Sequence, residues 1–389
     1  MSKAAYFGAA STARKIKSMY IGVGGVARKV KKGYIGVGGV ARLFYSGLPT
    51  PAALSAARYY LAGASVGNYA LFAGGGYGST SSNVVDAYNA SLTRSIPTAL
   101  SAERQSLAGA SVGNYALFGG GENYSTNTSS GVVDAYNTSL TRSIPTALNS
   151  GWSGLAGTTV GNYALFGGGY YINRKTLSAT SQAVNAYNAS LTNSFFAGLS
   201  DSRYYLAGAS VGNYALFAGG GSGSTSSNVV DALNTSLTRS TPTALSQGRT
   251  NLPGASVGNY ALFGGGRYAV QKYVAQVSGT VDAYNASLTR STPTALTYSL
   301  EYRSGASVGD YAIFTGGANA NGAAFAMGNA YNASLTQSTP ANLSSARHSL
   351  AGASVGNYAL FAGGLGTASG SFAYVVDAYN NNLEHTSSG

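Results

Sequence analysis

One stretch, VGNYALFAGGG at residues 66–76, recurs along most of the chain and constrains its fold more than any other feature. The further copies lie at 112–121, 160–169, 211–221, 257–266, 308–317 and 355–364. Successive copies are 46 to 51 residues apart. A nearly fixed period in this range is typical of repeat architectures, in which each copy is one supersecondary unit that packs against its neighbours.

The first half of the repeat predicts a β-hairpin. Residues 61–66 and 69–74 form two short apolar runs around Gly-Asn, a two-residue turn with glycine first that suits a tight hairpin. In the second run Leu71 and Phe72 are adjacent and both apolar. We therefore expect both faces of that strand to be buried, as in a sheet stacked between two other sheets.

The second half of the repeat predicts two more strands. Residues 84–89 form the third, and residues 92–100 form a fourth that contains Pro97. Because proline cannot donate to a strand ladder, the fourth strand should lie at the sheet edge. Four short antiparallel strands in each of seven copies predict an all-β fold, a seven-bladed β-propeller of four-stranded antiparallel blades.

The repeat resembles the Kelch family in the double glycine after an apolar strand, in Arg58 ahead of the first strand, and in Tyr88 of VVDAYN. The resemblance covers roughly residue 48 to the C-terminus. It implies the propeller architecture and leaves function open, because Kelch propellers serve many roles. Where the family has a tryptophan after the tyrosine this chain has Arg94, and its single tryptophan is Trp152. The repeat is therefore a divergent one.

The last copy ends in NNNLEHTSSG and lacks the PTAL that follows the third turn in four other copies. Residues 49–54, PTPAAL, supply a matching piece. We expect this N-terminal segment to donate the outer strand of the last blade. That exchange would close the ring and remove open sheet edges.

Residues 1–47 differ in composition from the propeller predicted at 48–389. They hold nine of the lysines and arginines and no acid, so about three of the twelve net positive charges remain for the propeller. Within them YIGVGGVAR occurs twice, at 20–28 and 34–42, and its glycine and β-branched residues favour small β-arches over a helix. We interpret 1–47 as a basic attachment or oligomerisation segment.

This doublet resembles N-terminal segments of phage tail and other virion proteins from phages of gut Firmicutes. The resemblance implies a virion protein that is assembled in the host cytoplasm and needs no secretory signal, and no apolar signal core follows Met1. A mitochondrial transit peptide and a nucleic-acid-binding arm are the alternatives for such a basic segment. The strand-like doublet disfavours the first, and we expect neither nucleic-acid binding nor membrane insertion, because no apolar run approaches the roughly 18 residues of a span.

The copies agree at one end of the predicted sheets and differ at the other. Turns one–two (Gly-Asn in six copies) and three–four (Asn-Ala-Ser or Asn-Thr-Ser in six) define a constant face. The loops between strands two and three, together with the links between blades, define a variable face rich in Tyr, Ser, Gly, Asn and Arg. Such residues are typical of adaptable binding surfaces. Unconstrained drift of the loops is the alternative explanation.

We expect the variable face to bind a ligand and its aromatic and arginine side chains to make the contacts. The expected ligand-binding residues are Tyr59, Tyr60, Tyr77, Tyr124, Trp152, Tyr170, Tyr171, Arg174, Tyr204, Tyr205, Arg267, Tyr268, Tyr273, Tyr302, Phe325 and Tyr374.

Repeated carboxylates are interpreted as structural. Centring the third turn on Ala90 places Asp86 opposite Arg94, and copies without the aspartate also lack the arginine. Paired replacement is expected for a cross-strand ion pair, which at an exposed site contributes at most about 1 kcal/mol. The predicted pairs are Asp86 with Arg94, Asp134 with Arg142, Asp231 with Arg239, and Asp282 with Arg290.

Little in the chain predicts catalysis, a cofactor or a metal site. The chain has no cysteine, and its two histidines, His348 and His385, are far apart in sequence. A glycan hydrolase would need two carboxylates that converge on one pocket, and the acids near the variable face are Glu103, Glu122, Asp201 and Glu301. The Asn-x-Ser triplets match a glycosylation signal but are interpreted as turns in which asparagine caps its own backbone.

These patterns together predict a non-enzymatic binding protein, a tail-associated phage adhesin that recognises a host-surface glycan or protein. Residues 1–47 would contact other virion proteins or further copies of the chain. The alternative is a structural or decorating virion protein whose propeller makes only assembly contacts.

Overall fold

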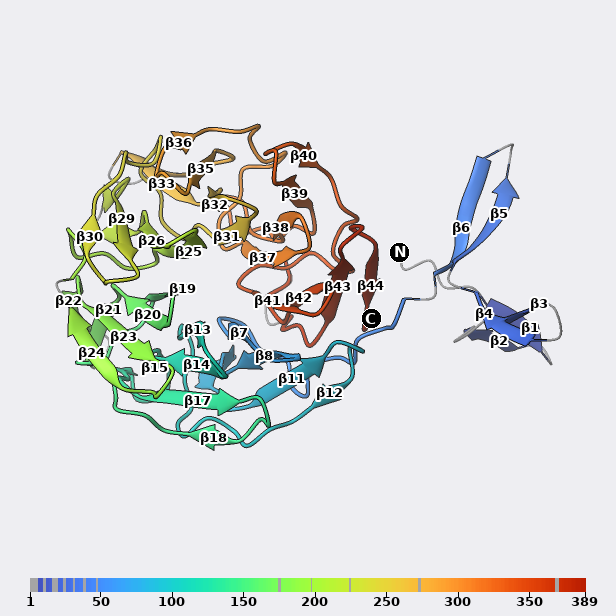
Figure 1. Ribbon diagram of the computed structural model, residues 1–389, viewed down its shortest axis with the longest axis horizontal. Coiled ribbons are helices and arrows are strands. Elements are labelled where there is room, and N and C mark those ends of the chain that lie inside the picture. Colours follow the sequence, from blue (N-terminus) through green and yellow to red (C-terminus); the bar gives the residue numbers. More distant parts are fainter. Residues whose placement is uncertain are drawn as a thin grey trace.

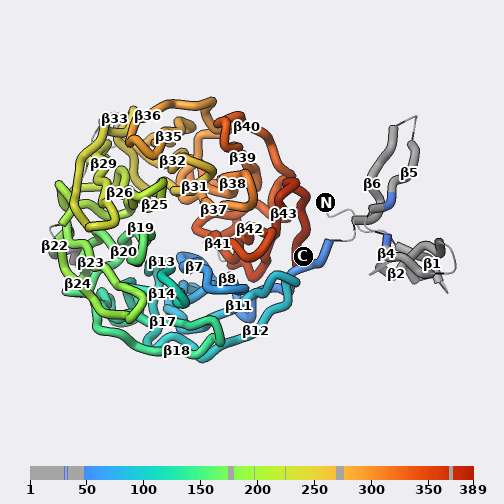
Figure 2. Tube along the Cα trace, viewed as in Figure 1, coloured from blue at the N-terminus to red at the C-terminus, as the bar shows by residue number. Residues whose placement is uncertain are grey.

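The computed structural model describes residues 6–9, 12–15, 20–23, 26–30, 32–37, 40–46, 48–173, 176–196, 198–223, 225–271, 274–367 and 371–389. All the regular elements that these residues form are β-strands. Among the same residues no helix is long and apolar enough to cross a membrane. The same residues form seven four-stranded antiparallel sheets of identical strand order, arranged as a ring (Figures 1 and 2). The predicted all-β propeller is confirmed.

The strands ahead of the ring pair as three antiparallel hairpins. They are β1 (Tyr6–Ala9) with β2 (Thr12–Lys15), β3 (Tyr20–Val23) with β4 (Val26–Lys29), and β5 (Lys32–Val37) with β6 (Val40–Ser46). The sequence doublet therefore forms strands, as predicted, and each copy is a hydrogen-bonded hairpin instead of an arch.

Each blade runs outward from the axis of the ring through four strands. The innermost are β7 (Ala62–Val66), β13 (Ala108–Val112), β19 (Ala156–Val160), β25 (Ala207–Val211), β31 (Gly254–Val257), β37 (Ser304–Val308) and β41 (Ala351–Val355). The second are β8 (Tyr69–Ala73), β14 (Tyr115–Gly119), β20 (Tyr163–Gly167), β26 (Tyr214–Ala218), β32 (Tyr260–Gly264), β38 (Tyr311–Thr315) and β42 (Tyr358–Ala362). The third are β11 (Val85–Asn89), β17 (Val133–Asn137), β23 (Val184–Asn188), β29 (Val230–Asn234), β35 (Val281–Asn285), β39 (Gly328–Asn332) and β43 (Val376–Asn380).

The outer strands are short. They are β12 (Arg94–Ser95), β18 (Arg142–Ser143), β24 (Asn193–Phe196), β30 (Arg239–Ser240), β36 (Arg290–Ser291), β40 (Gln337–Ser338) and β44 (His385–Ser387). The prediction of a long fourth strand at 92–100 is therefore wrong. Leu92 lies in the turn with a φ of 59°, and beyond Ser95 the chain leaves the edge, so that Leu100 donates its N–H to the carbonyl of Asn83.

Several loops between the second and third strands form hairpins of their own, which the sequence did not predict. They contain β9 (Gly76–Tyr77) with β10 (Thr80–Ser81), β15 (Glu122–Asn123) with β16 (Thr128–Ser129), β21 (Tyr170–Asn173) with β22 (Thr176–Thr180), β27 (Gly221–Ser222) with β28 (Thr225–Ser226), and β33 (Arg267–Gln271) with β34 (Val274–Val277). β16 also pairs with β21 of the next blade.

The ring closes differently from the expectation. The outer strand of the last blade is β44, which comes from the C-terminal end because the residues after the third turn reach the sheet edge. Residues 49–54 supply the link instead. The Leu54 N–H donates to the Tyr374 carbonyl at 2.7 Å, just as the Leu100 N–H donates to the Asn83 carbonyl at 2.8 Å between the first two blades.

The hydrophobic core lies between neighbouring blades. Leu71 is fully buried in a cluster that also contains Phe118 and Tyr136 of the second blade, whereas Phe72 is fully buried against Leu360 of the last blade. Both faces of β8 are thus buried, as predicted from the adjacent apolar residues. The first and last blades share one cluster, so the ring is sealed by apolar packing as well as by hydrogen bonds.

The innermost strands approach one another so closely around the axis that a side chain is excluded at one position. A Cβ added at Gly109 would lie 2.2 Å from the carbonyl oxygen of Gly63. At the equivalent glycine of each other blade, an added Cβ would lie 2.2 to 2.6 Å from the glycine carbonyl oxygen of the neighbouring blade. Two residues further on, a ring of seven hydroxyls donates from each blade to the preceding one; Ser111 Oγ, for example, donates to the Ser65 carbonyl at 2.7 Å.

Gly109→Ala should lower the free energy of unfolding by about 2–4 kcal/mol, because its methyl group would overlap backbone atoms that cannot move apart without opening the ring. The matched control is Gly264→Ala, whose Cβ would lie 3.5 Å from its nearest neighbour, at a position where β8 has Ala73. Urea unfolding should show little change in the control. Equal losses in both variants would contradict the close-approach explanation.

Candidate ligand-binding site

The two faces of the ring are organised as the sequence predicts. On the constant face, Gly67 of turn one–two packs against Thr138 of turn three–four in the next blade. The asparagine of turn three–four caps its own backbone, since Asn89 Oδ1 accepts from the N–H groups of Ser91 and Thr93 at 2.9 and 3.0 Å. The turn interpretation of the Asn-x-Ser triplets is therefore confirmed.

At the other end, a cavity of about 200 Å³ lies on the axis of the ring, and each blade contributes two consecutive link residues to its wall. The first residue varies: Tyr60, Ser106, Gly154, Tyr205, Asn251, Tyr302 and Ser349. The second is leucine in six blades and arginine in one: Leu61, Leu107, Leu155, Leu206, Leu252, Arg303 and Leu350. We call this space the axial cavity. Its size suits one sugar ring or a group of similar bulk, below the range typical of drug-sized pockets.

The variable residue is held by backbone bonds that do not depend on its side chain. In every blade it has a positive φ, from 51° at Tyr60 to 61° at Gly154. Its N–H donates to the carbonyl of the corresponding residue in the preceding blade, and Tyr60 donates to Ser349, so the seven bonds close into a ring. Because the backbone alone makes these contacts, the side chain that faces the axis can differ from blade to blade.

Aromatic rings gather on two sides of the axial cavity. On one side Tyr60 contacts Tyr59 and Tyr302, with ring centroids 5.2 and 6.0 Å apart, and Phe372 stacks on Tyr59 at 5.5 Å. This group continues outward to Tyr77 on Phe372 and to His348 on Tyr302. On the other side Tyr170, Tyr204 and Tyr205 contact one another pairwise at 5.3 to 5.5 Å.

The cavity tyrosines remain neutral hydrogen-bonding groups. Burial raises the pKa of Tyr60, Tyr205 and Tyr302 above the ordinary value, so their hydroxyls keep their protons at any physiological pH. Each can therefore donate one hydrogen bond and accept others.

Two carboxylates lie close to these tyrosines, on different blades. Glu122 accepts from the Tyr170 hydroxyl at 3.1 Å and from Gln105 Nε2 at 3.2 Å. Glu301 is 3% exposed and accepts from Arg267 at 3.0 Å and Asn251 at 3.1 Å. Burial raises the pKa of Glu301, although Arg267 and Asn251 act in the opposite direction. Both side chains are engaged within the wall.

The structure brings together half of the residues predicted to bind a ligand. Tyr60, Tyr205 and Tyr302 line the axial cavity. Tyr59, Tyr170 and Tyr204 contact these three through their rings, Tyr77 reaches Tyr59 by way of Phe372, and Arg267 pairs with Glu301. Tyr124, Tyr171, Tyr268, Phe325 and Tyr374 belong to the loops and line no part of this cavity. Arg174 and Tyr273 lie outside the described residues.

Sequence reasoning missed Phe372, Asn251 and Arg303 in this region. A signal for two of them was present, because aligning the links by the glycine that follows them, Gly63 in the first blade, places Asn251 with Tyr60 and Arg303 with Leu61. No comparable signal exists for Phe372, since the loops differ in length and only the folded ring brings it to Tyr59.

In the first blade, the link residues that line the axial cavity, Tyr60 and Leu61, follow a buried arginine that holds the link in place. Arg58 is 1% exposed and donates from Nη1 to the carbonyls of Gly74 and Val84, both at 2.7 Å, and from Nη2 to Asp86. Equivalent bonds to aspartate are made by Arg104, Arg203, Arg249 and Arg347. Burial lowers the pKa of Arg58, which the Asp86 carboxylate partly offsets.

The aspartates are therefore not the exposed cross-strand partners that the sequence predicted. Asp86 is fully buried, and its main partner is the link residue Arg58. Arg94 lies opposite Tyr88 in the ladder and reaches Asp86 only as a second partner, at 3.6 Å. The other predicted pairs recur in the same secondary role, at 3.8 Å for Arg142 with Asp134, 3.8 Å for Arg239 with Asp231 and 3.4 Å for Arg290 with Asp282.

Trp152, one of the residues predicted to bind a ligand, belongs to this framework as well and does not line the axial cavity. It occupies the link position that Arg58 has in the first blade, and it packs against the core between blades two and three. The aspartate of that blade is replaced by Asn185, which exchanges hydrogen bonds with Asn149. A neutral cluster thus replaces the buried ion pair, and the Trp152 indole N–H donates to Asn149 Oδ1 at 3.2 Å.

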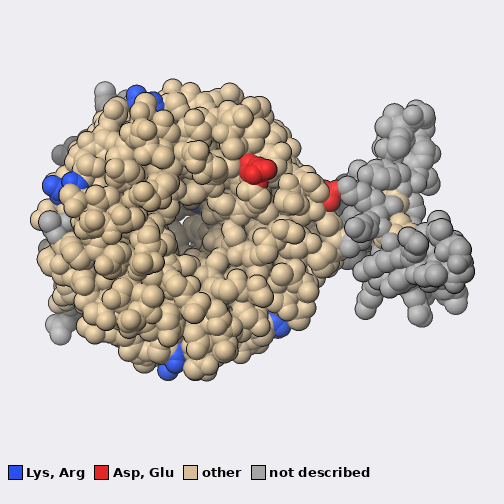
Figure 3. Space-filling view, in the orientation of Figure 1, with Lys and Arg blue, Asp and Glu red and all other residues tan. Residues whose placement is uncertain are grey.

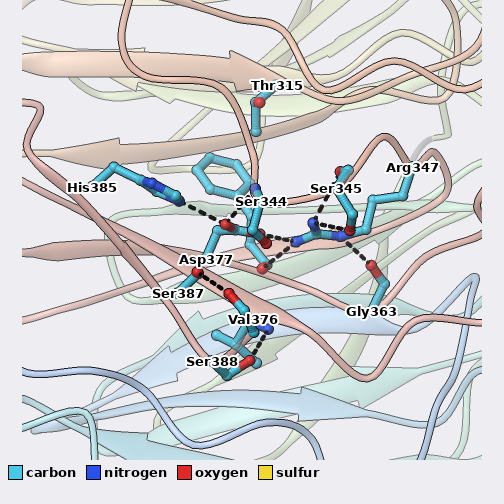
Figure 4. A network of polar contacts seen from close by, with 12 residues as sticks. Thr315, Ser344, Ser345, Arg347, Gly363, Val376, Asp377, His385, Ser387 and Ser388 are labelled. Carbon is cyan, nitrogen blue, oxygen red and sulfur yellow. Dashed lines mark hydrogen bonds and ion pairs between the residues drawn. The ribbon is translucent and has the colours of Figure 1, made fainter. Parts of the chain in front are cut away.

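Figure 4 shows the network of polar contacts around Asp377 in the last blade. Arg347 lies 2.6 Å from Oδ2, His385 Nε2 lies 2.6 Å from Oδ1, and the Ser344 N–H and hydroxyl also donate to the carboxylate. Burial alone would raise the pKa of Asp377, but the hydrogen bond from His385 and the charge of Arg347 outweigh it, so the pKa is lowered.

The described residues contain no group of three or more His, Cys, Asp or Glu side chains placed to hold a metal ion. Glu103 and Asp201 are exposed and lie outside the wall of the axial cavity. Charged side chains are few on the face seen in Figure 3, and the ring is hollowed at its centre.

The likeness to known proteins is one of fold. No protein-family model matches the chain, and none of the curated proteins matches it. Among solved structures, "Structure of YjhT" is similar with a TM-score of 0.59 and 13% identity, over 74% of this chain and 99% of the other. At that identity the likeness supports the β-propeller architecture alone.

Replacing the buried arginine of an aspartate should lower the free energy of unfolding far more than replacing its secondary arginine. Arg203→Met should lower the free energy of unfolding by about 3–5 kcal/mol, because it leaves Asp231 buried beside a less complete set of donors. Arg239→Met should cost less than about 1 kcal/mol, because that side chain is 36% exposed and lies 3.8 Å away. Urea unfolding measures both. A larger loss for Arg239→Met would restore the cross-strand interpretation.

Acid should erase the stabilisation that comes from Asp377. Its folded pKa lies below the unfolded value of about 3.9, so the contribution is present above roughly pH 4 and is lost as pH falls through the folded pKa. Asp377→Asn should therefore lower the free energy of unfolding by about 3 kcal/mol at pH 7, and the gap to the wild type should narrow at pH 3. A gap that is unchanged by pH would show that the charge plays no part.

Proposed function

We propose that the chain is a non-enzymatic, Kelch-like binding protein whose variable face recognises a host-surface glycan or protein at the axial cavity. The observation that carries the proposal is the gathering, around one small cavity, of tyrosines contributed by loops and links of separate blades. Tyrosine offers rigid aromatic area and a hydroxyl at low conformational cost, which suits recognition.

A glycan fits the chemistry of this wall better than an apolar ligand does. The neutral hydroxyls of Tyr60, Tyr205 and Tyr302 can exchange hydrogen bonds with sugar hydroxyls, and the aromatic faces can pack on the ring carbons. Glu122 and Glu301 are held by wall residues of different blades, an arrangement that supports binding in preference to hydrolysis.

The proposed setting is a phage virion, in which residues 1–47 attach a tail-associated adhesin to other virion proteins. Support for this setting comes from the basic, acid-free composition of that segment and from its repeated YIGVGGVAR hairpins. The division between the segment and a propeller at 48–389 belongs to the same proposal.

The test exploits the natural variation among blades. Tyr60, Tyr205 and Tyr302 occupy a position where other blades have serine or asparagine with the same backbone conformation. The triple variant Tyr60→Ser, Tyr205→Asn and Tyr302→Ser should therefore fold. We expect its binding to intact bacterial cells and to a glycan array to fall at least about tenfold relative to the full-length wild type, as loss of central aromatic contacts does in other interfaces.

Asp310→Asn is the matched control, because it gives the sixth copy the Gly-Asn turn of the other copies on the constant face. Its binding should equal that of the wild type. Unchanged binding by the triple variant would move recognition away from the axial cavity. Absence of wild-type binding on a broad panel would favour the alternative role, a structural virion protein that makes only assembly contacts.

A further inference from the structure

The sixth blade breaks the repeat at the axial cavity. Aligned on the links, leucine stands where the first blade has Arg58, and arginine stands where it has Leu61. The two residues that are exchanged are Leu300 and Arg303. A cation therefore replaces leucine in the one ring of the cavity wall that is otherwise uniform.

Arg303 is buried without the partners that the link arginines have. It is 6% exposed, and its Nη1 donates one long bond, 3.4 Å, to the Phe314 carbonyl. Its Nε and Nη2 have no hydrogen-bond partner among the protein atoms. Arg249 also has an unpartnered Nε, but it donates from Nη1 at 2.6 and 2.7 Å to two carbonyls and from Nη2 to Asp282, so the unpartnered Nη2 is what distinguishes Arg303.

No carboxylate of the sixth blade compensates Arg303. The aspartate position there is Asn329, opposite Phe314 in the ladder, and its side chain bonds to Thr297. Glu301 is already matched by Arg267 at 3.0 Å, and Glu122 contacts Tyr170 and Gln105 on the far side of the ring. Burial lowers the pKa of Arg303 to about 10, so the guanidinium is still charged at neutral pH.

We infer that Arg303 is an anion-binding residue of the axial cavity: its buried guanidinium turns from the Phe314 carbonyl toward the axis, and its Nε and Nη2 then hold a carboxylate of the ligand. These two nitrogens lie on one edge of the planar guanidinium, and their spacing matches the two oxygens of a carboxylate. The inference deepens the proposed function and rests on it, since it names the chemical class that the variable face recognises. Tyr302, the residue before Arg303, lines the same cavity.

The single long bond to Phe314 also makes this guanidinium the easiest of the buried ones to turn toward a ligand. The link arginines with an aspartate each hold several bonds that such a movement would break. At Arg303 a carboxylate would instead supply partners to a buried cation that has almost none, and relief of that desolvation cost favours binding.

The test is isothermal titration calorimetry of the full-length chain at constant ionic strength, with sodium glucuronate, sodium acetate and glucose as probes. Glucuronate should bind the wild type at least tenfold more tightly than glucose. Arg303→Leu, which restores the residue of the other six blades, should abolish this preference while the melting temperature stays equal or rises. Acetate should bind as tightly as glucuronate if the site contacts the carboxylate alone, and more weakly if the site also contacts the sugar. Either result supports the inference.

Asn329→Asp provides a second variant that does not alter the arginine. It restores the aspartate of the other blades and should weaken glucuronate binding by competing for Arg303. Equal affinity of the wild type for glucuronate and glucose, or a preference that survives in Arg303→Leu, would overturn the inference. In that case loss of cell binding by the tyrosine triple variant would still support the proposed function. Glucuronate binding that depends on Arg303, in a protein that does not bind cells, would support the inference about Arg303 and contradict the proposed function.

Discussion

The structure depends on how closely seven strands can approach one axis. At the position of Gly63 the backbones of neighbouring blades touch, and any Cβ would overlap a carbonyl oxygen. Because glycine allows this approach, the hydroxyl of Ser65 can reach the preceding blade, and further along the axis the N–H of Tyr60 can do the same. Both sets of bonds close into rings, so no blade is an end, although the chain enters the ring between the last and the first of them.

A second constraint is the buried ion pair that holds five of the seven links. An aspartate in the third strand is fully buried, and only a buried arginine with several further bonds makes that burial tolerable. The arginine comes from the link, so the pair fixes the stretch of chain that lines the axial cavity. Where the pair is absent the whole cluster changes, to Trp152 with Asn185 in the third blade and to Leu300 with Asn329 in the sixth.

These constraints separate framework from recognition. The backbone and the buried pair place one residue per blade at the cavity wall without using its side chain, so the same position holds tyrosine, serine, asparagine or glycine. Seven equivalent positions with different occupants produce an asymmetric cavity from a symmetric ring. Tyr60 and Tyr302 lie on one side, Tyr205 on the other, and Arg303 supplies the cation that the other blades lack at this depth.

The sequence by itself determined what depends on local chemistry and on repetition. The first three strands of each blade, the Gly-Asn and Asn-x-Ser turns, and the burial of both faces around Leu71 and Phe72 follow from short patterns, and the structure agrees to within about a residue. Only the tertiary structure decided the partner of Asp86, the framework role of Trp152, the short outer strands, and the meeting of Tyr60 with Tyr302. Each of these depends on which distant residue arrives in the same place when the ring closes, and no local pattern carries that information.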